Sequence, residues 1–135
     1  MALVSWSDTY SVKVKRFDEQ HKQILTLLNR LHDARSVGRG REVVGEVLAE
    51  LIAYTKSHFS NEEKLMQSQY YPGYLPHCHE HAELVRKVTE IQTGFAAGRI
   101  FISQEVLAFL KGWLERHIRG TDMKYGAHLN HKGVT

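Results

Sequence analysis

Histidine is the residue type that sets this sequence apart, because nine of its 135 residues are histidines. Two pairs of metal-ligand residue types stand four positions apart: His58 with Glu62, and His77 with His81. Residues four apart on an α-helix lie ~40° apart around its axis and ~6 Å apart along it, so each pair can hold one metal ion or two adjacent ions. A single pair is a weak indication, because this histidine content makes chance pairs common.

Three further candidates interrupt the apolar stripes of predicted helices, namely His21, His117 and Asp122. One histidine on an apolar face is usually a hydrogen-bonded core residue, but several buried polar groups without partners would each cost free energy. The five residues from His117 to Asp122 advance ~140° around an α-helix. Asp122 therefore reaches the same face only from a bent or widened last turn, which Gly120 would permit.

The elements that carry these residues are predicted to be helices. Only two prolines occur, Pro72 and Pro76, and apolar residues return every three or four positions. Asp18 and Ser103 are expected as N-caps of the first and last helices, and Gly38 is expected to break the first one. The predicted helices cover residues 18–37, 41–69, 74–97 and 104 to about 122.

Four helices joined by short loops pack most simply as an antiparallel up-down-up-down four-helix bundle, which makes the fold class all-α. We expect one domain over residues 1–135, with an N-terminal arm at 1–16, the bundle at 18–122 and a polar tail at 125–135. In this arrangement the first and third helices enter, and the second and fourth helices leave, at the same end. All candidate residues then meet at that end: His21, His58, Glu62, His77, His81, His117 and Asp122.

The composition of this set indicates which metals fit. Imidazole and carboxylate ligands suit iron, manganese or zinc. Seven ligands exceed what one ion usually takes, so two ions are implied. If both carboxylates bridge the ions and a solvent-derived oxygen joins them, all but one position of two octahedra are filled. The open position suits one small ligand.

Charge and composition exclude several other classes. The net charge is only +3, and the Lys and Arg residues are scattered among acidic ones, so we expect no nucleic-acid partner. No apolar run approaches the ~20 residues of a membrane span, and the first residues do not resemble a secretion signal. A cytoplasmic protein without membrane insertion is expected. The single cysteine, Cys78, excludes an internal disulfide.

The motifs resemble the hemerythrin family, in particular the single-domain bacterial hemerythrins, over nearly the whole chain. The residues that carry the resemblance are Trp6, Phe17-Asp-Glu-Gln-His21, His58-Phe-Ser-Asn-Glu62-Glu, His77-Cys-His-Glu-His81 and Trp113-Leu-Glu-Arg-His117-Ile-Arg-Gly-Thr-Asp122. The resemblance implies reversible O2 binding, for storage, delivery or scavenging, at two non-haem irons joined by an oxo or hydroxo bridge. It also implies a monomer that is not an enzyme.

Carried over by position, the resemblance assigns roles within the set. Glu62 and Asp122 bridge the irons, one iron takes His77, His81 and His117, and the other takes His21 and His58 with the open position. Residues matching Phe59, Met66, Trp113, Leu114 and Ile118 line the O2 pocket, with Trp113 and Leu114 as its gates. Alternatively, these five residues only pack in the hydrophobic core and do not line a pocket.

Two other functions stay open at this point. The first is a di-iron oxidase, peroxidase or NO-handling enzyme, although the chain has no Glu-x-x-His motif of the kind that carboxylate-rich di-iron proteins use. The second is an O2- or redox-sensing module that acts through a partner. Outside the pattern we expect surface or packing roles for Cys78 and His79, and solvated side chains for His32, His128 and His131. Glu63 is expected to point away from the site as a charged surface residue.

Overall fold

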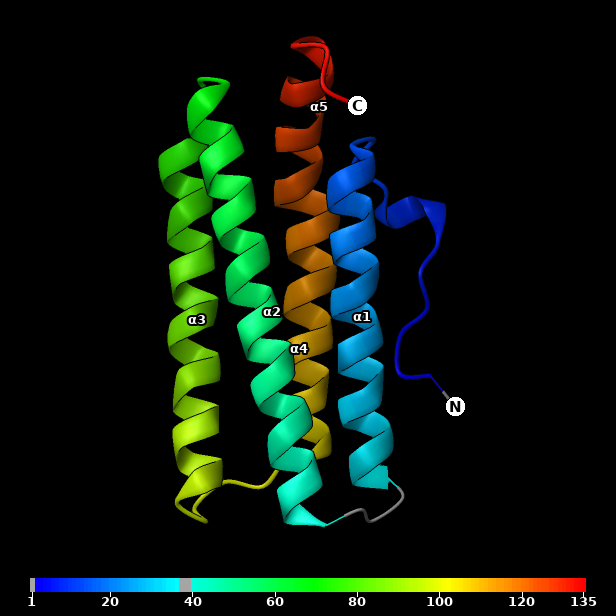
Figure 1. Ribbon diagram of the computed structural model, residues 1–135, viewed down its shortest axis with the longest axis vertical. Helices are drawn as coiled ribbons and strands as arrows, with labels where there is room; N and C mark the ends of the chain where they lie inside the picture. The colour runs from blue at the N-terminus through cyan, green and yellow to red at the C-terminus, as the bar shows by residue number, and fades with distance from the viewer. Residues whose placement is uncertain (1, 37–39) are drawn as a thin grey trace.

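The computed structural model describes residues 2–36 and 40–135, and every element in these residues is helical. Four rods stand side by side with alternating directions, as the up-down-up-down prediction requires (Figure 1). In chain order the elements are the 3-10 turn η1 (Asp8–Tyr10), α1 (Lys15–Ser36), α2 (Arg41–Ser68), α3 (Tyr74–Ala96), α4 (Gln104–Arg116), the π-helical segment η2 (His117–Asp122) and α5 (Met123–His131).

The predicted helix ends agree with the structure to within one residue for α2 and α3. Ser103 caps α4 as expected, because its side chain accepts a hydrogen bond from the backbone N–H of Val106. The predicted end of the first helix at Val37 and the break at Gly38 lie outside the described residues.

The predicted start of the first helix is wrong, since α1 begins at Lys15 and Asp18 lies inside its first turn. The carboxylate of Asp18 instead fastens the N-terminal arm. It accepts a hydrogen bond from the hydroxyl of Ser11 at 2.6 Å and one from the backbone N–H of Val12 at 2.8 Å. Asp18 therefore looks like an N-cap in the sequence because it has the right chemistry, but its partners lie in the arm.

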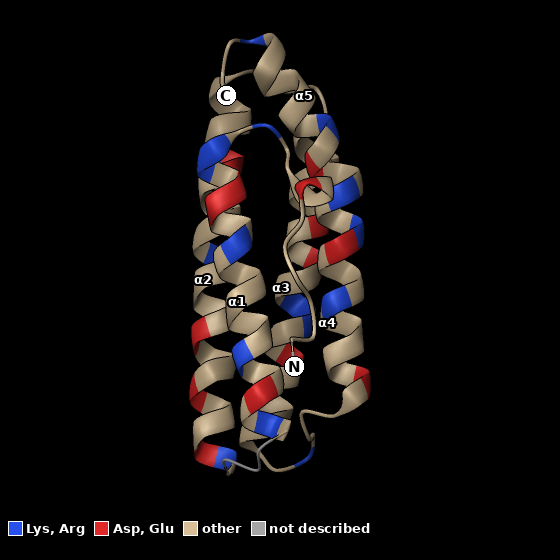
Figure 2. Ribbon diagram, turned by 90° about the vertical axis from the view of Figure 1, so that its right-hand side faces the viewer, with Lys and Arg blue, Asp and Glu red and all other residues tan. Residues whose placement is uncertain are grey.

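The arm runs along the outside of the bundle between α1 and α4 (Figure 2). Asn29 on α1 exchanges two hydrogen bonds with the backbone of Val4. The Tyr10 hydroxyl donates to Glu115 on α4 at 2.7 Å. Charged residues of both signs are interspersed along the helices in the same view. Within the described residues no helix has the length and apolarity that a membrane crossing needs.

The predicted polar tail is also wrong, because residues 123–131 form α5, which continues the rod of α4 and η2 (Figure 1). Two of its apolar residues, Tyr125 and Leu129, are fully buried in a small apolar cluster that also contains Phe17 and Met66. Two buried side chains four residues apart are enough to fix one face of a helix against the bundle.

Candidate metal centre

All seven predicted ligands come together inside the end of the bundle where α1 begins and α2 ends. Every one of these side chains is buried, and both carboxylates have no exposed surface. They come from all four rods: His21 from α1, His58 and Glu62 from α2, His77 and His81 from α3, and His117 and Asp122 from η2.

The two oxygens of Glu62 face two different groups of histidines. Oε1 lies 3.3 Å from Nε2 of His81 and 3.8 Å from Nε2 of His77. Oε2 lies 3.3 Å from Nε2 of His58 and 3.6 Å from Nε2 of His21. One carboxylate thus stands between the groups with one oxygen toward each.

Asp122 repeats this arrangement from the opposite rod. Its Oδ1 lies 2.9 Å from Nε2 of His77 and 3.2 Å from Nε2 of His117, while its Oδ2 lies 3.2 Å from Nε2 of His21. The ligand atoms accordingly form two compact sets that share Glu62, and these are Glu62-His77-His81-His117-Asp122 and His21-His58-Glu62. Two carboxylates placed in this way fit a pair of adjacent cations.

The hydrogen bonding of the cluster supports the same conclusion. Both oxygens of Glu62 and Asp122, and both ring nitrogens of His21 and His77, are buried without a well-aligned hydrogen-bond partner. A buried polar atom without a partner costs ~1–3 kcal/mol, and more when it is charged. Cations bound between these atoms would satisfy them, so the residues present fit a metal pair.

Three of the histidines are also held from behind the ring, where Nδ1 meets an acceptor on a neighbouring helix. A ring that donates from Nδ1 keeps its lone pair on Nε2, which is the arrangement a metal ligand needs. The three contacts are His58 Nδ1 with Gln20 Oε1 at 2.6 Å, His81 Nδ1 with Glu63 Oε2 at 2.8 Å, and His117 Nδ1 with Glu80 Oε1 at 2.9 Å.

Two of these rings face each other across the centre. Nε2 of His81 and Nε2 of His117 lie 3.2 Å apart. Glu63 and Glu80 each accept a hydrogen bond from Nδ1–H of one ring, so the two Nε2 atoms face each other and require a proton or a cation between them. The expectation that Glu63 points away as a surface residue is therefore wrong. Glu80 and Gln20 were not predicted, and the signal they offered is that each directly precedes a predicted ligand.

The charges of the cluster shift the pKa values of its members. Burial lowers the pKa of His117, but Asp122 and Glu80 outweigh it and raise the pKa to about 10. Burial likewise lowers the pKa of His21, and Asp122 with Glu62 raises it to about 9. Burial raises the pKa of Asp122, but the histidines facing it hold that pKa well below its usual range. The cluster therefore attracts positive charge, whether as protons or as metal ions.

The widened turn predicted before Asp122 is confirmed, since residues 117–122 form a π-helix. A π-helix bonds residues five apart, so His117 and Asp122 face the same way. The widened turn does not require a glycine at Gly120 for steric reasons, because a Cβ atom at this position would meet nothing within 4 Å. The spacing of five residues is thus accommodated by the backbone hydrogen-bond pattern.

Four of the five predicted pocket residues lie in the larger of the two apolar clusters, namely Phe59, Trp113, Leu114 and Ile118. The Phe59 ring stacks on His81 with a centroid distance of 3.8 Å, and the Trp113 ring stacks on His117 at 4.4 Å. Met66 does not join them, because it lies in the other apolar cluster with Phe17 and Tyr125.

The remaining histidines and the cysteine lie outside the centre. Cys78 and His32 are half-buried, and His79 and His131 are exposed. His128 is also half-buried, and its Nε2 lies 2.8 Å from the carbonyl oxygen of Gln69. The expectation that His32 and His128 are solvated is therefore wrong.

Comparison with known proteins gives one consistent result. The profile of the family described as Hemerythrin HHE cation binding domain matches residues 12–129. The bacteriohemerythrin of Stenotrophomonas maltophilia (strain R551-3) is 40% identical over 96% of this chain and 86% of that protein. The myohemerythrin of Theromyzon tessulatum is 28% identical over 92% of both chains. A crystal structure of wild-type hemerythrin superimposes with a TM-score of 0.91 at 36% identity, covering 95% of this chain and 98% of that one.

Proposed function

The chain belongs to the hemerythrin family, and on this basis we propose that it binds O2 reversibly at two irons held by the seven-residue cluster. The observation that carries the proposal is the placement of Glu62 and Asp122, each with one oxygen toward each group of histidines. An iron pair held in this way supplies the electrons for reversible O2 binding. We propose that the irons are joined by an oxo or hydroxo bridge.

The proposed division of ligands follows the two groups of atoms. His77, His81 and His117 would hold one iron, and His21 and His58 would hold the other, which has the open position. This division is supported by the two sets into which the ligand atoms fall around Glu62.

The other residues of the site have two roles in this proposal. Glu63 and Glu80 accept hydrogen bonds from Nδ1–H of His81 and His117 and keep Nε2 of each ring directed inward. Phe59 and Trp113 cover the same two rings with aromatic carbon and reduce the access of water. Leu114 and Ile118 extend this apolar wall, with Trp113 and Leu114 as the proposed gates.

At the scale of the cell we propose a monomeric cytoplasmic protein that stores, delivers or scavenges O2 as one hemerythrin-like domain. The Lys and Arg residues are interspersed with Asp and Glu along the helices (Figure 2), and this supports the expectation that the protein has no nucleic-acid partner.

Metal analysis combined with absorption spectra tests this function. The purified protein is analysed for metals, and its spectrum is recorded under nitrogen, then in air, and again under nitrogen. We expect two irons per chain and charge-transfer bands that appear in air and disappear under nitrogen. One zinc per chain, or an irreversible change, contradicts the proposal. Steady O2 consumption with an electron donor would instead indicate an enzyme.

A further inference from the structure

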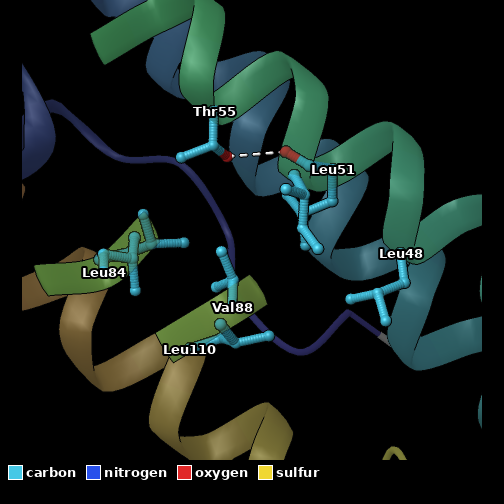
Figure 3. A pocket seen from close by; sticks show the side chains of 8 residues that line it. Leu48, Leu51, Thr55, Leu84, Val88 and Leu110 are labelled. Carbon is cyan, nitrogen blue, oxygen red and sulfur yellow. Dashed lines mark hydrogen bonds between the residues drawn. The ribbon is translucent and has the colours of Figure 1, made fainter. Parts of the chain in front are cut away.

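A small apolar cavity lies between α2, α3 and α4, deeper in the bundle than the metal centre. The space inside it that is open to the centre of a water-sized sphere has a volume of about 20 Å³. A cavity volume of roughly 10–15 Å³ is enough to hold one water molecule. The side chains around it include Leu51, Thr55, Leu84, Val88, Leu110 and Leu114, all of them buried (Figure 3).

The lining offers almost nothing to a water molecule. Thr55 is its one residue with a polar side chain, and the Thr55 hydroxyl donates its hydrogen bond to the carbonyl of Leu51 at 2.8 Å (Figure 3). A buried water needs two to four polar partners, and cavities without them stay dry and accept small apolar molecules. The cavity therefore fits an apolar molecule of roughly the size of water.

The position of the cavity links it to the metal centre. On α2, Thr55 precedes His58 by three residues, and on α3 Leu84 follows His81 by three. Leu114 likewise precedes His117 by three residues. Three residues correspond to ~4.5 Å along a helix axis. The cavity thus begins about one turn from the ligands on each of these rods. Its apolar side chains belong to the cluster that also contains Phe59 and Ile118.

We propose that this cavity is a docking site for one O2 molecule that is approaching the metal centre or has left it. The inference rests on the proposed function for the identity of the gas, whereas the cavity itself is a property of the apolar residues. O2 is apolar and small enough for the available volume. Unlike water, it needs no hydrogen-bonding partners, and the cavity offers almost none. Its return from this site competes with its escape to solvent.

Xenon binding tests the cavity without relying on O2 chemistry. Crystals of the iron-loaded protein kept under nitrogen are exposed to xenon, and xenon is located by its anomalous scattering. We expect one xenon atom among Thr55, Leu84 and Val88. Val88→Ile adds one methylene to the wall and should abolish this peak, whereas Val88→Ala should strengthen it. An ordered water in place of xenon, or no xenon at all, overturns the proposal.

Two control variants guard against indirect effects. Val47→Ile makes the same change at a buried valine of α2 that does not line the cavity, and it should keep the xenon peak. Thr55→Val removes the hydroxyl at nearly constant shape and should keep the peak as well. Circular dichroism of each variant verifies that it is folded, so a lost peak in Val88→Ile reports on the cavity.

A second experiment tests the site with O2 itself. Flash photolysis of the oxygenated protein measures the fraction of O2 that rebinds to the metal centre before it escapes to solvent. This fraction should fall in Val88→Ile, rise in Val88→Ala and stay constant in Val47→Ile. A xenon site combined with unchanged rebinding overturns the proposal. Reversible O2 binding without a xenon site overturns the cavity and leaves the proposed function intact. Xenon without reversible O2 binding overturns the proposed function and, with it, the assignment of this site to O2.

Discussion

At the level of single residues, the protonation of the imidazoles decides what the cluster can bind. His81 and His117 place Nε2 atoms 3.2 Å apart, and each ring donates a hydrogen bond from its Nδ1–H to a carboxylate behind it. Glu80 also accepts hydrogen bonds from the hydroxyl of Thr121 at 2.9 and 3.0 Å. It therefore holds the η2 segment to α3 and orients His117 at the same time.

Replacing Glu80 tests this orienting role. In Glu80→Ala the His117 ring loses its acceptor, and loss of such a partner typically weakens metal binding about 10–100-fold. Glu80→Gln keeps an acceptor oxygen and should retain iron better than Glu80→Ala does. The measurement is the rate at which a chelator removes iron. Glu83→Ala is the matched control, because Glu83 is an exposed carboxylate on the same helix. Equal rates in Glu80→Ala and Glu83→Ala would refute the role.

A second prediction at this scale concerns pH. The pKa values of His21 and His117 are raised to about 9 and about 10 in the metal-free fold, against an ordinary value of 6.5. A raised pKa stabilises the fold fully below the ordinary value, and this contribution is lost as the pH rises through the raised pKa. The metal-free protein should therefore lose stability between pH 6.5 and about 10.

In the iron-loaded protein the metal takes the place of these protons, so the same loss should be absent. Thermal unfolding of both forms across this pH range makes the comparison. A metal-free protein whose melting temperature stays level up to pH 10 would show that the buried carboxylates do not hold these histidines protonated.

At the level of elements, the π-helical segment and α5 show how the last rod completes the site. The five-residue spacing of His117 and Asp122 requires the π-helix, and α5 then continues the rod to bury Tyr125 and Leu129. Gly126 lies on the buried face of α5. A Cβ atom at this position would stand 2.4 Å from the backbone oxygen of Val12 in the arm.

Two glycine substitutions separate this close contact from ordinary helix propensity. Gly126→Ala forces the arm or α5 to move, and overpacking of this kind usually costs ~1–3 kcal/mol. Gly120→Ala meets nothing within 4 Å and should be neutral or stabilising by up to ~1 kcal/mol. Urea unfolding of both variants measures the difference. If Gly126→Ala is as stable as Gly120→Ala, α5 is not packed against the arm in solution.

The sequence predicts the bundle and the level at which the ligands meet, because both follow from helical periodicity and alternating direction. What it misses are contacts that cross between elements. Gln20 on α1 serves His58 on α2, and Glu63 on α2 serves His81 on α3. No spacing along one helix encodes such a pair. Asp18 misleads for the same reason, since its hydrogen bonds go to the arm.

At the level of the whole molecule, the chain combines a polar centre with an apolar interior. The two buried carboxylates and five histidines lie where the four rods meet, and the larger apolar cluster fills the bundle beyond them. The profile match over residues 12–129 and relatives at 36–40% identity show that the chain belongs to the hemerythrin family. The function then depends on how many ions this centre holds and where they lie.

Anomalous diffraction at the iron edge from crystals of the iron-loaded protein tests that point most directly. The account predicts two iron peaks per chain between Glu62 and Asp122, one beside His77, His81 and His117 and the other beside His21 and His58. A single peak within the cluster, or iron bound elsewhere on the chain, would contradict it.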